Sequence, residues 1–360
     1  MISADNVLIN GGHIGSAYIS NPFMKKNVLI SLILLTFISC NDRENYDLIE
    51  IAGSTMGTTY SVKYLSNSSK SVEEVKSKIS LILENVNNQM STYIPDSELS
   101  QFNNYNDTSW FSISADLAFV LQQSLDICRI SNGALDITVG QLVNLWGFGP
   151  ENKPTIVPTD SKIEKALILV GWKNIAVTLE PPAVKKKLPE IYCDLSSTAK
   201  GFGVDKVSDY LVSLGIKNYL VEIGGELRAA GKKSIDNEWR IGISKPDNNS
   251  SLQEVITLNN NAMATSGDYW NYFEENGIRY SHTINPKTGR PIKHKLASIT
   301  VFAETCLSAD GLATAIDVMG EEDGYQFAID NEIPAYFIIR NKNEYVVNCN
   351  SYFERFIVQN

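Results

Sequence analysis

The chain has 360 residues, 43% of them hydrophobic and 20% charged, a composition typical of a globular protein with one large domain or two modest ones. Its net charge of −10 at pH 7 argues against nucleic acid as a partner, because nucleic acid phosphates need a basic protein face. An acidic chain is still compatible with a phosphate ligand that is bridged by magnesium.

The first residues look separate from the folded body. Residues 1–23 show neither a helical nor a strand period, and they precede Met24, a second methionine that opens an export signal. We interpret 1–23 as a misassigned N-terminal extension. The polar residues 41–47 predict a tether, so the folded domain is expected to cover 48–360.

Residues 24–40 have the layout of an export signal. Lys25 and Lys26 are followed by an apolar run over 28–38 that is too short to span a bilayer comfortably. The run ends at Cys40, which predicts a lipoprotein signal peptide that leaves Cys40 as the lipidated first residue. A plain signal peptide or a buried strand is the alternative interpretation.

The folded body is expected to begin with a strand and a long helix. Residues 51–64 are rich in threonine, tyrosine and valine, and Gly57 inside this strand indicates a bulge or a close approach to a ligand. Ser71 and Glu74 form a capping box for a helix that we expect to end near Met90.

The middle of the chain predicts a second helix and two loops. The helix begins after Ser114 and stops at residues 132–133, and the aromatic, glycine-rich residues 145–150 form a loop that suits a planar ligand or core packing. Lysines at 185–187 are interpreted as a solvated loop.

A strand, a turn of small residues and a helix follow one another after residue 190. Residues 191–195 predict the strand, and the turn after it contains Ser197 and Lys200 at the start of a helix. Such an arrangement is a natural anion seat, although it matches neither the Walker motif nor the dinucleotide glycine motif.

The remaining segments mix strands and helices without strict alternation. We expect strands at 219–229, 239–244 and 297–303, a helix or turn at 263–273, a helix at 309–319, and a closing hairpin of 335–339 with 345–349. This order predicts an α+β fold, in which mixed or antiparallel sheets pack against helices.

A histidine and two oxygen donors lie close together in the C-terminal part. His282 stands just before a turn, and Asp310 and Thr314 are four residues apart, so both project from one face of a helix. Their oxygens are donors that magnesium prefers, which suggests chemistry on a phosphate ester. In the alternative interpretation, Asp310 caps the helix and Thr314 is a buried hydroxyl. His294 lies between two lysines and is expected to be exposed.

Four cysteines follow the proposed lipid site: Cys128, Cys193, Cys306 and Cys349. Their spacing indicates neither a metal site nor a disulfide framework, so we interpret them as small apolar residues. A pairing of Cys193 with Cys306 remains open, because both flank the proposed site.

Seven short motifs follow one another from residue 48 to the C-terminus. In chain order they are Met56-Gly57-Thr58, residues 90–93, Ala134-Leu135-Asp136, Asp194 to Ser197 with Lys200-Gly201, Glu222 with Gly224-Gly225, Ser281-His282 with Asn285-Pro286 and Thr288-Gly289, and Asp310 with Thr314. Together, in this order, they resemble the ApbE family, the FAD:protein FMN transferases. One departure is Asn285, where the family often has aspartate, which puts in doubt a carboxylate role there.

The resemblance implies a magnesium-dependent enzyme that transfers FMN from FAD to a threonine hydroxyl of an acceptor protein and releases AMP. Asp310 and Thr314 would ligate magnesium through their side chains and Ser197 through its carbonyl, while His282 would be the catalytic base. The residues that would line the FAD site are Met56, Tyr93, Ala134, Leu135, Asp136, Asp194, Lys200, His282, Thr283 and Ile284.

The resemblance also implies partners and a location. The usual acceptors are flavin-carrying subunits of sodium-translocating NADH:quinone reductase and related electron-transfer complexes, and the enzyme would be an exported, membrane-anchored lipoprotein. Two other functions stay open: an FAD pyrophosphatase that uses water as the nucleophile, and a lipoprotein that binds FAD without turnover.

Overall fold

The computed structural model describes residues 46–66, 70–150, 157–234, 237–246, 251–267, 272–275, 277–342 and 344–358, all within one compact unit, Glu44–Asn360. The proposed extension, the signal peptide with Cys40 and most of the tether lie outside these residues. Within the described part, no helix is both long and apolar enough to cross a bilayer.

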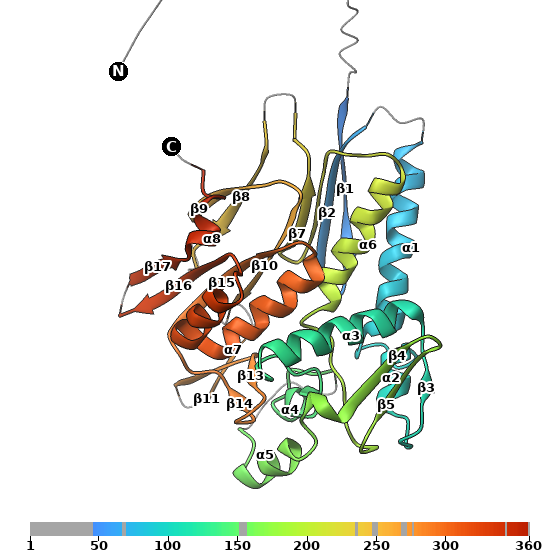
Figure 1. Cartoon of the computed structure of the whole chain (residues 1–360), viewed down its shortest axis with the longest axis vertical. Coiled ribbons are helices and arrows are strands. Elements are labelled where there is room, and N and C mark those ends of the chain that lie inside the picture. Colours follow the sequence, from blue (N-terminus) through green and yellow to red (C-terminus); the bar gives the residue numbers. More distant parts are fainter. Residues whose placement is uncertain are drawn as a thin grey trace, which may run out of the picture. The chain divides into compact units, whose positions relative to one another are not determined.

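An eight-stranded sheet organises the fold, and all of its neighbouring strands pair antiparallel. Its order is β1 (Asp47–Thr55), β2 (Thr58–Ser66), β6 (Tyr219–Ile223), β7 (Glu226–Ala230), β10 (Asn261–Gly267), β15 (Leu296–Ala303), β16 (Ala335–Asn341) and β17 (Glu344–Cys349) (Figure 1). The α+β prediction is therefore confirmed.

Helices cover one face of this sheet. The covering helices are α1 (Val72–Met90), α6 (Ala199–Ser213) and α7 (Cys306–Asp330), and α3 (Ala115–Ile130) packs against α7 (Figure 1). Apolar side chains of β2 and β6 meet those of α1 and α6, and β10, β15 and β16 meet α7 and α3. The core between the helices and the sheet thus extends from β1 to β16.

Smaller elements complete the structure. The opposite face of the sheet packs on β8 (Trp239–Ser244), β9 (Leu252–Leu258) and α8 (Ser351–Glu354). A three-stranded sheet joins β3 (Phe111–Ser112), β5 (Pro182–Lys186) and β4 (Ile175–Leu179), and two hairpins join β11 (Tyr272–Glu275) to β12 (Ile278–Ser281) and β13 (Ile284–Asn285) to β14 (Arg290–Pro291). The short helices are α2 (Glu98–Asn103), α4 (Gly140–Leu145), α5 (Asp160–Leu167) and a 3-10 turn, Trp172–Asn174.

The local helix signals are confirmed. Ser71 and Glu74 form both hydrogen bonds of the capping box at the start of α1. Ser114 caps α3 by accepting a hydrogen bond from the Leu117 amide, and the hairpin of β16 and β17 closes where it was predicted. These elements depend on neighbours in the sequence, which explains why the sequence alone identifies them.

Two segments that were predicted as interrupted strands are hairpins. Met56 and Gly57 have φ angles of 50° and 73° and form the two-residue turn between β1 and β2. Gly224 and Gly225, with φ angles of 62° and 105°, do the same between β6 and β7. Left-handed φ angles at turn residues match the right-handed twist of hairpin strands, so these glycines reverse the chain rather than interrupt one strand.

Two other predictions are wrong because tertiary contacts determine the local structure there. Residues 191–195 form no strand: the Cys193 amide donates to the Asn103 side chain. The helix or turn predicted at 263–273 begins instead as strand β10. The sequence does not indicate this strand, because Ala262, Met263 and Ala264 are all buried and the alternation of apolar and polar residues is lost.

Two basic residues are less exposed than predicted. Lys186 lies in β5 with 1% of its surface exposed, and its Nζ donates to the Asn103 and Ile191 carbonyls. His294 is half-buried, with Nε2 against the Asp317 carbonyl. The four body cysteines are all free, so Cys193 and Cys306 are not paired, and Cys349 is only half-buried.

Candidate active site

The predicted anion seat lies at the start of α6. The Phe202 amide donates to the Thr198 carbonyl, so the hydrogen-bond ladder of the helix begins at Thr198. The Thr198 hydroxyl accepts from Ser124 on α3 at 3.1 Å, which fixes the turn against the core. Ser197 precedes this cap, so its carbonyl lies outside the helical ladder, and Lys200 lies in the first turn.

Lys200 joins two buried carboxylates from different elements. Its Nζ is 3.0 Å from Glu226 Oε1 on β7 and 3.9 Å from Asp310 Oδ1 on α7. The backbone amide of Gly201 donates to Asp310 Oδ2 at 3.1 Å. We call Lys200, Glu226 and Asp310 the Lys200 cluster. It places a helix N-terminus, a lysine and two carboxylates around one point.

Burial controls the charges of the Lys200 cluster. It raises the pKa of Glu226 to about 8 and the pKa of Asp310 to about 6, although the ammonium of Lys200 opposes both shifts. Burial alone would lower the pKa of Lys200, but the attraction of the two carboxylates for the ammonium is larger and raises this pKa. The lysine is therefore positively charged at neutral pH and can neutralise a phosphate oxygen.

Asp310 is not a helix cap, because Thr305 caps α7 by accepting from the Ser308 amide at 3.2 Å. Asp310 lies further into the helix and is buried, and Thr314 is half-buried one turn later. Asp310 as a cap is thus ruled out as an explanation of this motif. The carboxylate instead faces the start of α6, beside the turn that contains Ser197.

The chemistry of three oxygen donors suits a magnesium ion. They are the carboxylate of Asp310, the hydroxyl of Thr314 one turn later on α7 and the carbonyl of Ser197 before α6, all hard ligands. Among the described residues, no group of three or more His, Cys, Asp or Glu side chains could hold a metal. A single carboxylate with neutral oxygens is nevertheless compatible with magnesium, which commonly takes one or two carboxylates and completes its shell with phosphate and water.

The loop with His282 is bound to the same helix. His282 lies between β12 and β13, and the hydroxyl of the next residue, Thr283, donates to Asp317 Oδ2 at 3.2 Å. Ser266 on β10 donates to the same oxygen at 3.0 Å. Asp310, Thr314 and Asp317 are spaced by four and three residues, so they share one face of α7. The histidine loop and the Lys200 cluster are therefore attached to one face of one helix.

An aromatic loop lies beside His282. The Phe148 ring lies edge-on to the imidazole, with 6.3 Å between centroids, and the Tyr93 hydroxyl donates to the Phe148 carbonyl at 3.1 Å. Tyr93 is 65% exposed, so it is available to a ligand rather than part of the core. Trp146 from the same glycine-rich loop is buried and donates from Nε1 to the Gly289 carbonyl, so it is core.

Met56 connects the β1–β2 turn to the start of α6. A hollow of about 450 Å³ is lined by residues 54–59, Met56 among them. The Met56 methyl carbon lies 3.0 Å from the position that a Cβ on Gly203 would occupy, one turn after Lys200. This turn therefore lies beside the Lys200 cluster.

Several other residues that were predicted to line the FAD site have side chains with a structural role. Ala134, Leu135 and Ile284 are buried, and Asp136 accepts hydrogen bonds from Thr138 and the Trp172 amide. Asp194 accepts from the Ser196 amide at 2.7 Å. Any contact of the alanine, the leucine or the isoleucine with a ligand would be through the backbone.

Asn285 organises the turn after the histidine. Its side-chain oxygen accepts from the amides of Lys287 and Thr288 at 2.9 and 3.2 Å. An aspartate could accept the same two hydrogen bonds, so the departure noted in the sequence leaves the turn intact.

Sequence reasoning missed three acidic residues at this site: Glu226, Asp205 and Asp317. Glu226 directly follows the Gly224-Gly225 turn, and Asp317 follows Asp310 by seven residues. The spacing of both residues from these motifs could therefore have indicated them as site residues. No such spacing indicates Asp205, because its partners lie about a hundred residues away in α7.

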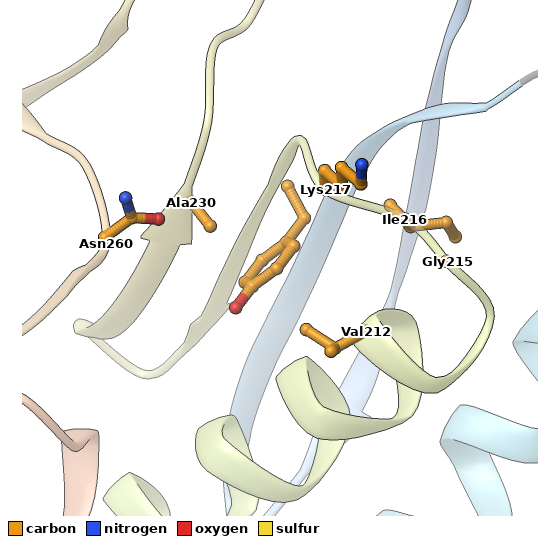
Figure 2. Close-up of a pocket in the computed structure, with 7 residues that line it drawn as sticks. Val212, Gly215, Ile216, Lys217, Ala230 and Asn260 are labelled. Atoms are coloured by element: carbon orange, nitrogen blue, oxygen red, sulfur yellow. The ribbon is translucent and has the colours of Figure 1, made fainter.

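A second hollow lies away from this site. It has a volume of about 340 Å³ and is lined by Val212, Ile216, Tyr219, Ala230 and neighbouring residues (Figure 2). Tyr219 and Ala230 pair at one end of the β6–β7 hairpin, whereas Ile223 and Glu226 pair at the other. The hollow is about 13 Å along the strands from Glu226 and carries none of the candidate site residues.

The fold and the site are those of an α+β enzyme of phosphate-ester chemistry, in which a lysine at a helix N-terminus lies against two buried carboxylates. The chain belongs to the ApbE family, whose model matches residues 56–337.

Similar proteins agree with this membership. The chain is 43% identical to a FAD:protein FMN transferase of Vibrio cholerae, over 92% of this chain and 99% of that protein, and 45% identical to one of Haemophilus influenzae, over 92% and 98%. Among solved structures, it resembles the flavin transferase ApbE from Vibrio cholerae with a TM-score of 0.81 and 43% identity, over 87% of this chain and 100% of that one. The apo flavinyl transferase ApbE of Pseudomonas stutzeri gives a TM-score of 0.80 and 36% identity, over 86% and 97%.

Proposed function

We propose that this protein transfers FMN from FAD to a threonine hydroxyl of an acceptor protein and releases AMP. Family membership supports the flavin transfer, and the observation that carries the assignment of the site is the Lys200 cluster at the start of α6. The cluster combines a cation and a carboxylate that suit a pyrophosphate and its metal.

Asp310, Thr314 and Ser197 would hold a magnesium ion. When bound, magnesium neutralises charge on the pyrophosphate and on the departing phosphate. Lys200 would bind a phosphate oxygen directly, and Glu226 would hold the lysine side chain in position through the 3.0 Å contact.

His282 would accept the proton of the attacking hydroxyl. The threonine oxygen forms a bond to the phosphorus on the flavin side, the bond between that phosphorus and the bridging oxygen breaks, and AMP leaves. The threonine proton passes to an imidazole nitrogen of His282, since a reference pKa near 6.5 lets a histidine act as a base at neutral pH. Tyr93 and Phe148 would pack against a planar ring of the substrate.

We also propose that the protein is exported and anchored to a membrane by a lipid on Cys40. The charged and apolar segments of residues 24–40 support this location. The acceptors would then be flavin-carrying subunits of sodium-translocating NADH:quinone reductase or related complexes. Radiolabelled fatty acid should be incorporated by the natural chain in cells and not by a Cys40→Ala variant.

The function can be tested with the chain from residue 41 onward, incubated with FAD, magnesium and an acceptor domain. Mass spectrometry should show an acceptor that has gained an FMN residue on threonine, with one AMP released per transfer. AMP and free FMN without modification of the acceptor would indicate a pyrophosphatase instead. Binding of FAD with no turnover would indicate a flavin carrier.

A further inference from the structure

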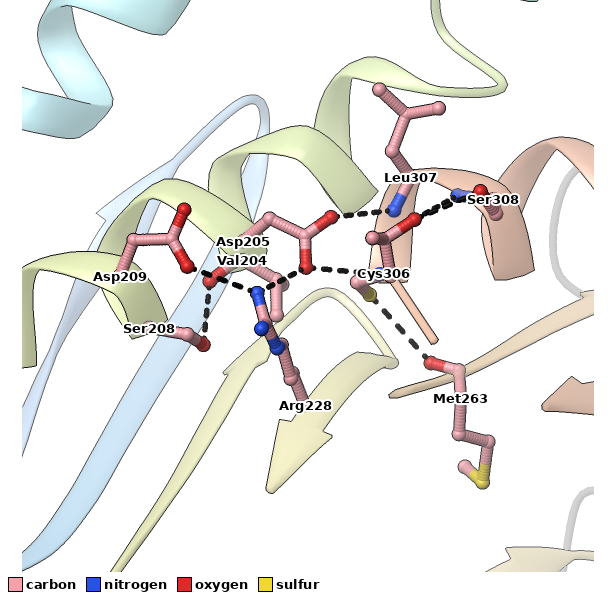
Figure 3. Close-up of polar contacts among 10 residues, drawn as sticks. Val204, Asp205, Ser208, Asp209, Arg228, Met263, Cys306, Leu307 and Ser308 are labelled. Atoms are coloured by element: carbon pink, nitrogen blue, oxygen red, sulfur yellow. Dashed lines mark hydrogen bonds and ion pairs between the residues drawn. The ribbon is translucent and has the colours of Figure 1, made fainter. Parts of the chain in front are cut away.

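A second set of contacts joins the same three elements that carry the Lys200 cluster (Figure 3). Asp205 on α6 accepts from the Cys306 amide at 3.0 Å through Oδ1 and from the Leu307 amide at 2.9 Å through Oδ2. Arg228 on β7 donates from Nη1 to Asp205 Oδ1 at 3.0 Å. The carboxylate thus holds the first turn of α7 from a neighbouring helix.

This second set lies beside the first. Asp205 follows Lys200 by five residues on α6, and Arg228 follows Glu226 by two residues, so the two β7 side chains share one face of the strand. Leu307 precedes Asp310 by three residues on α7. Each of the three elements therefore contributes both to the Lys200 cluster and to the contacts of Asp205.

The electrostatics favour a fixed carboxylate at this point. Asp205 is buried, which raises its pKa, while the two α7 amides and Arg228 favour the charged form. Hydrogen bonds to a charged acceptor are stronger than those between neutral groups, and a negative charge at a helix N-terminus interacts favourably with the helix dipole. Displacing α7 relative to α6 would break both hydrogen bonds from the α7 amides together.

We propose that Asp205, held by Arg228, is a positioning residue that sets the location of Asp310 and hence the affinity of the site for a divalent cation. This inference rests on the proposed function. Asp205 touches neither the oxygen donors nor the substrate in this assignment, and it acts through the placement of α7.

The test uses Asp205→Asn in the chain from residue 41. This variant removes the charge and replaces one acceptor oxygen by an amide donor, so one α7 amide loses its partner. Titration with Mn²⁺, followed by its EPR signal, should show binding weakened on the order of tenfold, as expected for the loss of a charge-assisted hydrogen bond. Hydrogen exchange of residues 304–312, measured without metal or FAD, should become faster.

Asp209→Asn is the matched control. Asp209 lies one turn further along α6 and contacts Arg228 at 3.2 Å, but its side chain is largely exposed and, within the described part of the chain, forms no hydrogen bond or ion pair with α7 (Figure 3). The control should bind Mn²⁺ as tightly as the unsubstituted chain and keep its rate of hydrogen exchange.

Two outcomes separate this inference from the function on which it rests. If the unsubstituted chain binds Mn²⁺ and Asp205→Asn binds it equally well with unchanged exchange, the positioning role is wrong while the function stands. If the unsubstituted chain binds no cation, both fail. Should Asp205→Asn not fold, Arg228→Gln leaves both backbone hydrogen bonds in place and should weaken Mn²⁺ binding by about threefold. Unchanged binding in that variant would also overturn the inference.

Discussion

The amide of Gly201 and the carboxylate of Asp310 are hydrogen-bonded across 3.1 Å, and this contact joins the first turn of α6 directly to α7. The approach requires a residue without a side chain, because a Cβ at position 201 would lie 2.3 Å from the Cys306 carbonyl oxygen. The lysine and the carboxylate of the candidate site therefore come from two helices whose starts touch.

Gly201→Ala should destabilise the protein. The added methyl group meets backbone atoms that cannot move by a rotamer change, so we expect a loss of roughly 1–3 kcal/mol in the free energy of unfolding, as for other overpacked sites. Urea denaturation measures this loss. Gly203→Ala is the control, since its nearest neighbour is the flexible end of Met56 at 3.0 Å. Equal stability of the two variants would contradict the close approach of α6 and α7.

Asp310→Ala should abolish magnesium-dependent transfer. It removes the one carboxylate among the proposed metal ligands, and the oxygen donors that remain are neutral. Transfer of FMN to an acceptor, measured against magnesium concentration, should stay at the level seen with EDTA. Asp330→Ala, at the exposed end of the same helix, should keep the natural magnesium dependence. Full activity of Asp310→Ala would remove the metal assignment.

His282→Ala should slow transfer and leave FAD binding intact. General-base catalysis commonly contributes 10² to 10⁴ in rate, so a decrease of about that size is expected in single-turnover experiments. The dissociation constant for FAD, measured by the quenching of flavin fluorescence, should change by less than about threefold. Transfer at the natural rate would exclude His282 as the base.

The free energy of unfolding of the metal-free protein should fall as pH rises from about 5 to 8. Glu226 has a pKa of about 8 in the folded state and an ordinary value of 4.5, so between these values the folded state binds a proton that the unfolded state has lost. Stability then falls with pH by up to about 1.4 kcal/mol per unit for one such group. Asp310, whose pKa rises from 3.8 to about 6, acts in the same direction at lower pH.

Glu226→Gln supplies the control for this pH dependence. Glutamine does not titrate, so stability measured by urea denaturation in EDTA should depend much less on pH between 6 and 8. A slope equal to that of the unsubstituted protein would show that another group causes the dependence.

The sequence predicts those parts of the fold that depend on near neighbours. The start of α1 needs only Ser71 and Glu74, and the face of α7 that carries Asp310 and Thr314 needs only their spacing. Residues 191–195 were misassigned because the partner of Cys193 is a side chain ninety residues away, and Lys186 was misassigned because Asn103 and Ile191 provide carbonyls that no local pattern reveals.

The candidate site also depends on contacts between distant parts of the chain. The family motifs include Lys200 and Asp310, and Glu226 directly follows one of these motifs, but its contact with Lys200 depends on how α6 packs over the β6–β7 hairpin. Asp205 could not be identified from the sequence either. Its position in α6 looks like that of an ordinary helix residue, and its role depends on where α7 lies.

The attachment of the histidine loop to α7 has a consequence for substrate size. Asp310 and Asp317 are separated by seven residues of helix, hence by about 10.5 Å along its axis. Because Thr283 bonds Asp317, the separation of the His282 segment from Asp310 is determined by helical rise and not by the length of a loop. One inserted residue between them would turn Asp317 by about 100° and detach the histidine loop. The number of helical residues between Asp310 and Asp317 therefore determines how long a molecule must be to contact both Asp310 and the His282 loop.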